Sequence, residues 1–219
     1  MMSRGVFISV EGIDGAGKSS RIHQLALGLR EQGHEVVETL EPGATALGRE
    51  LRELLLHTEG PIASRTEALL YAADRAQHVA EVVEPALARG AVVISDRYLD
   101  SSVAYQGGGR ELSAREIREL SLWATGGLLP DLSILLDLPV PTALARVAGG
   151  AGAPDRLERE HIDFHQRVRD AFLRFAAAEP ERFRVVSADQ VPERVDAQVR
   201  QAVDEWFAAE AAVGVRGDR

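Results

Sequence analysis

The feature that most constrains this fold is a glycine-rich segment directly behind a short apolar run. Residues 12–20 read GIDGAGKSS, and the run VFISV precedes them closely. Residues 12–19 fit the pattern G-x-x-x-x-G-K-[ST] in full, with strand-like sequence before it and helix-like sequence after it. Bare backbone N–H groups and the start of the following helix can then surround a polyphosphate. The pattern therefore predicts a phosphate-binding loop between a strand and a helix.

Two side chains of this loop, together with one acid elsewhere, predict a site for a nucleotide and Mg²⁺. We expect Lys18 to reach the outer phosphates and Ser19 to offer its hydroxyl to the metal. Asp96 follows a second apolar run, at the edge where α/β sheets place ligands, so we expect it to bind the metal directly or through water. The loop residues predicted to hold the phosphates of a nucleoside triphosphate are Gly12, Ile13, Asp14, Gly15, Ala16, Gly17, Lys18 and Ser19.

Short apolar runs alternate with helix-period segments along the whole chain. The runs at residues 5–10, 35–39, 91–95, 132–138 and 183–187 are rich in β-branched residues and bounded by Gly, Pro or charge. Most are apolar throughout, as expected for strands that are covered on both faces. The alternation predicts an α/β fold with a five-stranded parallel sheet flanked by helices.

One compositional break interrupts this pattern. Residues 148–154 read AGGAGAP, a small and flexible stretch between helix-like segments. We predict a single domain over residues 1–212, with a short flexible lid at about residues 146–158. The stretch VGVRGDR at the C-terminus predicts a disordered tail over residues 213–219.

Charge and composition exclude several functional classes. The formal net charge of −9 argues against a general nucleic-acid binder, which would need a basic face. No apolar run approaches the roughly 20 residues that a membrane span needs, so we expect no membrane association. The opening residues lack the long apolar core of a signal peptide, and the sequence has no cysteine. We therefore expect a cytoplasmic protein without disulfides.

Two arginines predict a second site for an anion. Arg75 lies four residues after Tyr71, on the same face of a helix-like segment. Arg97 comes directly after Asp96, which follows the predicted strand at residues 91–95. A guanidinium group binds phosphate through two parallel hydrogen bonds. Taken singly, each arginine is more often a surface ion-pair partner. The phosphate loop elsewhere in the chain favours a role for both in binding a phosphorylated acceptor.

At this point five blocks resemble the thymidylate kinase family, in the family's order. They are GIDGAGKSS, EPGAT at residues 41–45, LLYAADR at 69–75, DRYLDSSVAYQGGGR at 96–110 and PDRLERE at 154–160. The resemblance runs from Val6 to about Val186. It implies a P-loop nucleoside-monophosphate-kinase fold, usually a homodimer packed through helices. It also implies an enzyme that transfers the γ-phosphate of ATP to dTMP, giving dTDP and ADP for dTTP synthesis.

The resemblance also implies residue roles in the acceptor site. Arg97, with Arg75, would hold the dTMP phosphate, and Tyr71 would lie against the thymine ring. Tyr105 would pack near the sugar and exclude a ribose 2′-hydroxyl, and Asp14 would face that sugar. Ser102 and Gln106 would hydrogen-bond the base. The full predicted acceptor site is Asp14, Glu41, Pro42, Arg52, Tyr71, Arg75, Arg97, Ser102, Tyr105 and Gln106.

The chain departs from the family in two places. Many relatives have Arg and Gly where this chain has Leu40 and Ala44, so any phosphate contact of that arginine must come from elsewhere. The phosphate loop carries Gly15 where some relatives have an arginine, so a transition-state arginine should come from the lid. Arg156 is the first choice and Arg146 the second. The residues predicted to act in catalysis are thus Lys18, Asp14, Arg97 and Arg156.

Three other interpretations stay open. A kinase for another nucleotide or a deoxynucleoside would share the phosphate loop, although Tyr105 and Gln106 suit a pyrimidine without a 2′-hydroxyl. A nucleotide-dependent switch protein would also use this loop, but the chain has no guanine-reading Asn-Lys-x-Asp element. At Asp14, a solvated loop aspartate remains the alternative to a sugar contact.

Overall fold

A five-stranded parallel sheet forms the centre of the computed structural model, which describes residues 4–150 and 155–217, with side chains as far as residue 212. The strand order is β2-β3-β1-β4-β5, and every neighbouring pair is parallel. The strands are β1 (Val6–Glu11), β2 (Val36–Leu40), β3 (Val92–Asp96), β4 (Leu132–Asp137) and β5 (Phe183–Ser187). The predicted sheet is confirmed, and each strand end lies within one residue of its expected place.

The central strands are apolar because both of their faces are covered. Val93 and Ile94 of β3, and Phe7 and Ile8 of β1, are completely buried, with successive side chains on opposite faces. They join two hydrophobic clusters, one containing Ile8 and Ile94 and the other Phe7 and Val93. This burial explains why these segments do not alternate between apolar and polar residues.

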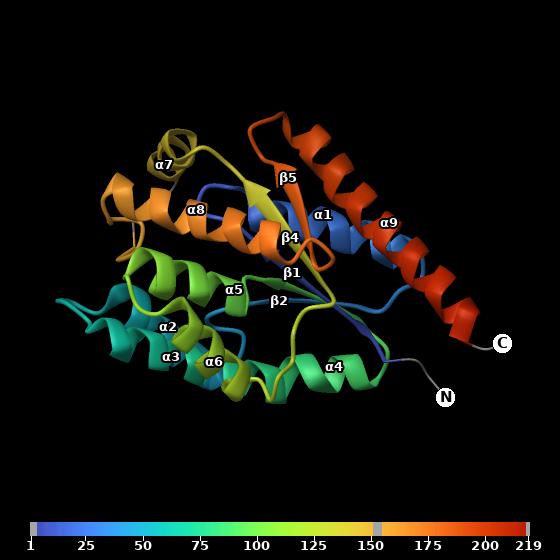
Figure 1. Ribbon diagram of the computed structural model, residues 1–219, viewed down its shortest axis with the longest axis horizontal. Coiled ribbons are helices and arrows are strands. Elements are labelled where there is room, and N and C mark those ends of the chain that lie inside the picture. The colour runs from blue at the N-terminus through green and yellow to red at the C-terminus, as the bar shows by residue number, and fades with distance from the viewer. Residues whose placement is uncertain (1–3, 151–154, 218–219) are drawn as a thin grey trace.

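Helices flank the sheet on both sides (Figure 1). Helices α1 and α9 pack together on one side of it, and α5 and α8 pack together on the other. The helices are α1 (Lys18–Glu31), α2 (Ala46–His57), α3 (Ser64–His78), α4 (Glu84–Ala88), α5 (Leu99–Ser102), α6 (Ala114–Ala124), α7 (Val140–Ala148), α8 (Ile162–Ala178) and α9 (Pro192–Gly217), with the π-helical turns η1 (Val79–Val83) and η2 (Val103–Gly109).

A helix-period apolar stripe is readable in the sequence at Ala68, Leu69, Ala72, Ala76, Val79, Ala80 and Val83. The segment runs through α3, η1 and α4 without a break, and Ala68, Ala72 and Val83 are buried. Leu69 is the exception and is 58% exposed. It lies about 100° around the helix from Ala68, so it points away from the core.

The predicted lid and tail are described only in part. Helix α7 ends at Ala148, and the lid residues 151–154 lie outside the described residues. Helix α9 continues to Gly217, into the segment expected to be a tail, and residues 218 and 219 lie outside the description. The flexible lid, the disordered tail and the single domain over residues 1–212 stay predictions; the five strands form one sheet.

The carboxyl ends of β1, β2 and β3 meet at one edge and position the loops that follow them. The backbone N–H of Arg97, after β3, donates to the Val10 carbonyl of β1 at 3.0 Å. The N–H of Glu41, after β2, donates to the Asp96 carbonyl at 2.9 Å. Three loops are thereby held side by side. Among the described residues, no helix has the length and apolar character needed to cross a bilayer.

Candidate functional site

The phosphate loop joins β1 to α1 in a shape that requires glycine. Gly12, Gly15 and Gly17 have φ angles of 138°, 81° and 86°. A Cβ atom at Gly12 would lie 2.6 Å from the Leu136 carbonyl oxygen. The first N–H groups of α1 have no carbonyl one turn earlier, so they remain available to an anion. The loop can therefore approach polyphosphate with its backbone.

Lys18 closes the loop on itself. Its Nζ atom donates to the carbonyl oxygens of Gly12 and Ile13, each at 3.2 Å, and lies 3.7 Å from Asp14 Oδ1. Burial, together with the nearby charge of Arg97, lowers the pKa of Lys18, and Asp14 and Asp96 oppose that shift. An anionic ligand in the loop would add to the groups that keep this ammonium charged.

Ser19 and Asp96 form a hydrogen-bonded pair beside the loop. Ser19 Oγ donates to Asp96 Oδ2 at 2.6 Å, and both residues line a pocket with Lys18. A hydroxyl and a carboxylate are oxygen ligands of the kind that Mg²⁺ prefers. The described residues hold no group of three His, Cys, Asp or Glu side chains suited to a metal. The pair thus fits an ion that takes its other ligands from phosphate and water.

Asp14, Arg97 and Tyr105 form a compact network next to the phosphate loop. Arg97 Nη2 donates to Asp14 Oδ1 and, at 3.2 Å, to the Tyr105 hydroxyl, and that hydroxyl donates to Asp14 Oδ2 at 3.0 Å. Burial opposes ionisation of Asp14, but the charges of Arg97 and Lys18 outweigh it and hold the pKa of Asp14 below its ordinary value. Asp14 is therefore a carboxylate at any working pH.

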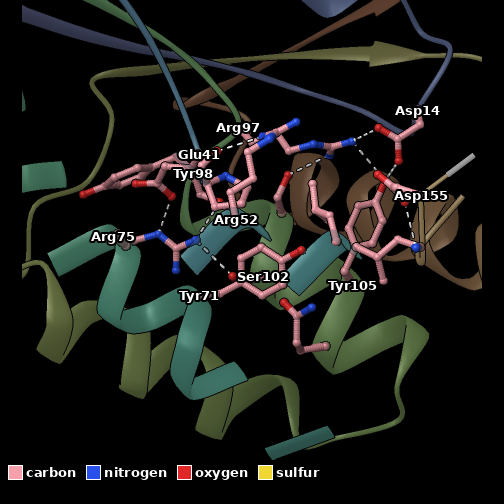
Figure 2. A pocket seen from close by; sticks show the side chains of 15 residues that line it. Asp14, Glu41, Arg52, Tyr71, Arg75, Arg97, Tyr98, Ser102, Tyr105 and Asp155 are labelled. Carbon is pink, nitrogen blue, oxygen red and sulfur yellow. Dashed lines mark hydrogen bonds and ion pairs between the residues drawn. The ribbon is translucent and has the colours of Figure 1, made fainter. Parts of the chain in front are cut away.

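The backbone of Arg97 is itself unusual. Its φ angle is 71°, in the left-handed region that a non-glycine residue rarely adopts. Its Nη1 atom donates to the Gly12 carbonyl at 3.0 Å and to Ser101 Oγ at 3.1 Å. This conformation directs the side chain back across the carboxyl end of the sheet toward the phosphate loop (Figure 2).

Arg75 belongs to a separate network. It is buried, with Nε donating to Glu41 Oε2 at 2.7 Å, Nη1 to Ser121 Oγ at 3.1 Å and Nη2 to Ser102 Oγ at 3.0 Å. Figure 2 shows Arg75 and Ser102 on the opposite side of the pocket from Asp14. The two predicted clamp arginines therefore line one cavity but share no hydrogen-bond partner in the described structure.

A single cavity brings the predicted acceptor residues together. The ten predicted side chains all line it, and five further residues join them: Leu56, Tyr98, Ser101, Asp155 and Leu157. The pocket that contains Lys18, Ser19 and Asp96 shares Asp14, Glu41, Arg52 and Arg97 with this cavity. The two anion sites predicted from the sequence are thus adjacent.

Arg52 occupies the region affected by the Leu40 and Ala44 departure. Its Nη1 atom donates to the Pro42 carbonyl at 2.8 Å, and its side chain packs against Gly43. Because Arg52 lines both pockets, it brings a cation to the loop that lacks the family's arginine.

The two lid arginines lie in different places. Arg156 donates through Nε to the Leu55 carbonyl at 2.8 Å and pairs with the buried carboxylate of Glu67. Arg146 donates to the Gly15 carbonyl of the phosphate loop at 3.4 Å and to the Ala188 carbonyl at 3.2 Å. Arg146 thus touches the phosphate loop and Arg156 pairs with Glu67, and neither lines the donor pocket or the acceptor cavity.

Sequence reasoning missed the buried charges on α3. Glu67, Asp74 and His78 share the buried face of this helix with Tyr71 and Arg75. His78 Nδ1 lies 2.8 Å from Glu41 Oε1, and Asp74 Oδ1 accepts from the Gly43 N–H at 3.0 Å. The sequence did carry a signal for them, because Glu67, Tyr71, Asp74 and His78 follow one another at intervals of four, three and four residues along an apolar stripe.

Glu11, at the end of β1, was also missed. It is completely buried, and Ser101 Oγ donates to its Oε2 atom at 2.6 Å. Burial and the nearby Asp100 raise the pKa of Glu11 to about 8, although the Ser101 hydrogen bond and the charge of Arg97 oppose this shift. Glu11 therefore stays largely protonated at neutral pH, and it shares the Ser101 hydroxyl as a partner with Arg97.

Comparisons with known proteins agree with the geometry. The family model described as thymidylate kinase matches residues 10–199. A protein named thymidylate kinase from Clavibacter sepedonicus is 60% identical over 208 residues, which cover 95% of this chain and 99% of the relative. Similarly named proteins from Leifsonia xyli and Bifidobacterium longum are 58% and 54% identical, over 91% and 92% of this chain and 95% and 98% of their own lengths.

Proposed function

The chain belongs to the thymidylate kinase family, and we propose that it transfers the γ-phosphate of ATP to dTMP, giving dTDP and ADP, in the synthesis of dTTP. It is an enzyme, an ATP-dependent phosphotransferase. The observation that carries this proposal is the pair of adjoining pockets, one built on the phosphate loop and the other lined by the acceptor residues. A donor and an acceptor can thus lie end to end.

At the donor end, the backbone of residues 12–19 would surround the phosphates of ATP. The ammonium group of Lys18 donates to the carbonyl oxygens of Gly12 and Ile13 and lies 3.7 Å from Asp14. A phosphate oxygen is a stronger partner than a carbonyl, so Lys18 would exchange those carbonyls for the outer phosphates. Arg146, which already touches the loop, is the lid arginine placed to add a second positive charge there.

Mg²⁺ would be held by Ser19 and by Asp96, directly or through water. The ion would neutralise charge on the phosphates of ATP when bound. Ser19 and Asp96 already meet through a hydrogen bond of 2.6 Å, so little rearrangement is needed to present both oxygens to one cation.

At the acceptor end, Arg97 would hold the dTMP phosphate against the donor. That phosphate is itself the nucleophile, and one of its oxygens attacks the γ-phosphorus while ADP leaves. No general base is needed, and positioning with charge neutralisation accounts for the rate. Asp14 fits this view, since its low pKa makes it a poor base and suits it to bind the sugar hydroxyl and orient Arg97.

The other acceptor residues would fix the nucleoside. Tyr71 would lie against the base, and Tyr105, between Asp14 and Arg97, would pack against the sugar. Ser102 and Gln106 would contact the base edge. Arg75 lies with Ser102 on the wall far from Asp14, so we propose that it supports the base-binding wall rather than sharing the phosphate with Arg97.

The alternative, a kinase for another nucleoside monophosphate or a deoxynucleoside, is not favoured. A panel assay separates the two: purified protein, ATP and Mg²⁺ with dTMP, dUMP, dCMP, dGMP, dAMP and thymidine. We expect dTDP to form fastest. Another acceptor that is phosphorylated as fast as dTMP, or faster, would refute the assignment. Omission of Mg²⁺ should abolish turnover and tests the metal separately.

A homodimer packed through helices is part of the proposal. Leu69 on α3 and Trp123 on α6 are 58% and 82% exposed, on helices that contact each other. A second copy would cover these apolar side chains. Trp123→Asp should shift the mass measured by light scattering from dimer to monomer; a monomeric parent protein would refute the dimer. The cytoplasmic location, and the absence of nucleic-acid or membrane partners, remain predictions from composition.

A further inference from the structure

Helix α5, which follows Arg97 in the chain, is held by a buried arginine that directly precedes β5. Arg182 donates from Nη1 to Asp100 Oδ2 at 2.6 Å and from Nη2 to Asp100 Oδ1 at 2.9 Å. The two side chains are only 10% and 2% exposed. We propose that Arg182 is a positioning residue for phosphoryl transfer, because its ion pair with Asp100 fixes α5 and thereby the Arg97 guanidinium. This inference rests on the proposed function.

Arg182 itself is placed away from both ligands. It lines neither the acceptor cavity nor the donor pocket. Its Nη1 atom also donates to Ser133 Oγ of β4 at 2.8 Å, and Ser133 Oγ lies 2.9 Å from Ser9 Oγ of β1. The guanidinium group is therefore anchored on two central strands of the sheet, and it connects them to Asp100, 82 residues away in the sequence.

Helix α5 has few internal contacts that could hold its orientation. It has four residues, and its N-cap residue, Tyr98, makes no side-chain capping bond. A helix this short is unstable on its own. The buried Leu99 gives α5 apolar contacts, but such contacts are non-directional. Two parallel bonds between an arginine and a carboxylate are directional, so the pair at Asp100 determines how α5 is turned.

The position of α5 in turn affects the contacts that hold the Arg97 side chain. On one side, Arg97 donates to Gly12 and Asp14 of the phosphate loop. On the other side, it donates to Ser101 Oγ at 3.1 Å and to one residue of η2, in the continuous α5 and η2 segment. Ser101 directly follows Asp100, so a shift of α5 would move a partner of Arg97.

The backbone of Arg97 also depends on support from both directions. Its φ angle of 71° is unfavourable for a non-glycine residue and persists only where the surroundings impose it. Toward β3, its carbonyl accepts from Ser95 Oγ at 2.7 Å and its N–H donates to the Val10 carbonyl at 3.0 Å. In the other direction the chain enters α5, where the Arg182 ion pair supplies the second anchor.

The test is a double-mutant cycle between Arg182 and Arg97. Steady-state kcat and KM for dTMP and for ATP are measured for the parent protein, Arg182→Met, Arg97→Ala and the double variant. Arg182→Met should lower kcat/KM for dTMP at least about 10-fold, because small misplacements of a binding group are costly. KM for ATP should stay within about 3-fold of the parent value, since the phosphate loop is unchanged.

In the Arg97→Ala background the result should differ. There, Arg182→Met should lower kcat/KM for dTMP by less than about 3-fold, because the group that it positions is already absent. A purely structural role of Arg182 would not produce this dependence on Arg97. Fully additive effects of the two changes, or an equal loss for ATP and dTMP in Arg182→Met, would overturn the inference.

The matched control is Arg169→Met, which breaks another two-bond arginine–aspartate pair. Arg169 donates to Asp137 at the end of β4 through Nε at 2.7 Å and Nη2 at 2.9 Å. Because this pair does not include α5, kcat/KM for dTMP should stay within about 3-fold of the parent value. A loss as large as that in Arg182→Met would show that α5 is not the element concerned and would also overturn the inference.

A second variant covers the case in which Arg182→Met does not fold. Removal of the arginine alone leaves the buried Asp100 charge without its partner, whereas replacement of both ions by apolar residues often keeps a fold intact. The double change Arg182→Met and Asp100→Leu should again lower kcat/KM for dTMP at least about 10-fold. Parent-like kinetics in this folded variant would overturn the inference. Failure of the proposed function would look different, because the parent protein itself would then show no preference for dTMP.

Discussion

The donor and acceptor ends of the cleft are built in different ways. At the donor end, the phosphate loop with the strand before it and the start of the helix after it is contiguous in residues 6–20 and offers mainly backbone groups, and Asp96 joins it from β3. The acceptor end collects side chains from segments between Asp14 and Leu157. Recognition by the backbone is local and leaves a complete motif in the sequence, whereas recognition by side chains depends on how distant elements pack.

The largest expected effect concerns the two arginines that flank the glycine-rich stretch of the predicted lid. Arg146 touches the phosphate loop, and Arg156 pairs with Glu67. Arg146→Ala should slow single-turnover phosphoryl transfer by about 10³-fold, as loss of a transition-state arginine does. Arg156→Ala should chiefly raise KM for dTMP. The reverse result would support Arg156 as the catalytic lid arginine, as the sequence predicts.

A slightly smaller effect is expected at the donor end. Lys18→Ala removes the only loop side chain placed to neutralise the outer phosphates, so kcat should fall by at least about 10²-fold. The far-UV circular dichroism spectrum and the melting temperature check that the fold is retained. Unchanged turnover in a folded variant would show that the loop does not hold the reacting phosphates.

At the acceptor end, the effect should be confined to one substrate. Arg97→Ala removes the guanidinium that contacts Asp14, Ser101 and Tyr105. Loss of a charged hydrogen-bond partner is worth about 1.5–3 kcal/mol, so kcat/KM for dTMP should fall about 10- to 100-fold. KM for ATP should stay near the parent value. If the use of ATP and the use of dTMP weakened equally, Arg97 would not be specific to the acceptor end.

The smallest expected effect is on the stability of the folded protein and acts through Glu11. Glu11 has a pKa of about 8 in the folded protein against an ordinary 4.5. The folded protein therefore keeps a proton that the unfolded chain loses, and the free energy of unfolding falls as the pH rises between these values. Glu11→Gln should flatten this part of the pH dependence and raise the melting temperature at pH 8.

Each kcal/mol of stability gained in Glu11→Gln corresponds to about 2–4 °C for a chain of this size. Thermal unfolding followed at pH 5.5, 6.5 and 8 provides the measurement, and Ser101→Ala, which keeps the buried carboxyl but removes its hydrogen bond, is the control. A parent protein whose melting temperature rises steadily across this range would contradict the raised pKa.

The sequence by itself determined the sheet and the donor site. Five apolar runs predicted five parallel strands, because strands covered on both faces need apolar side chains at every position. The phosphate loop could be assigned from eight consecutive residues, because its glycines and its lysine act through local backbone geometry.

Only the tertiary structure decided how the acceptor wall is supported. Glu67 lies 39 residues from Gln106 and 89 from Arg156, and no pattern in the sequence pairs them. It also gave Arg75 and Arg97 different hydrogen-bond partners within one cavity, whereas the sequence predicts that both hold one phosphate. A buried charge is stable only with partners. The partners of Glu67 come from η2 and from the segment after the lid, which pack against α3. Local sequence does not encode that packing.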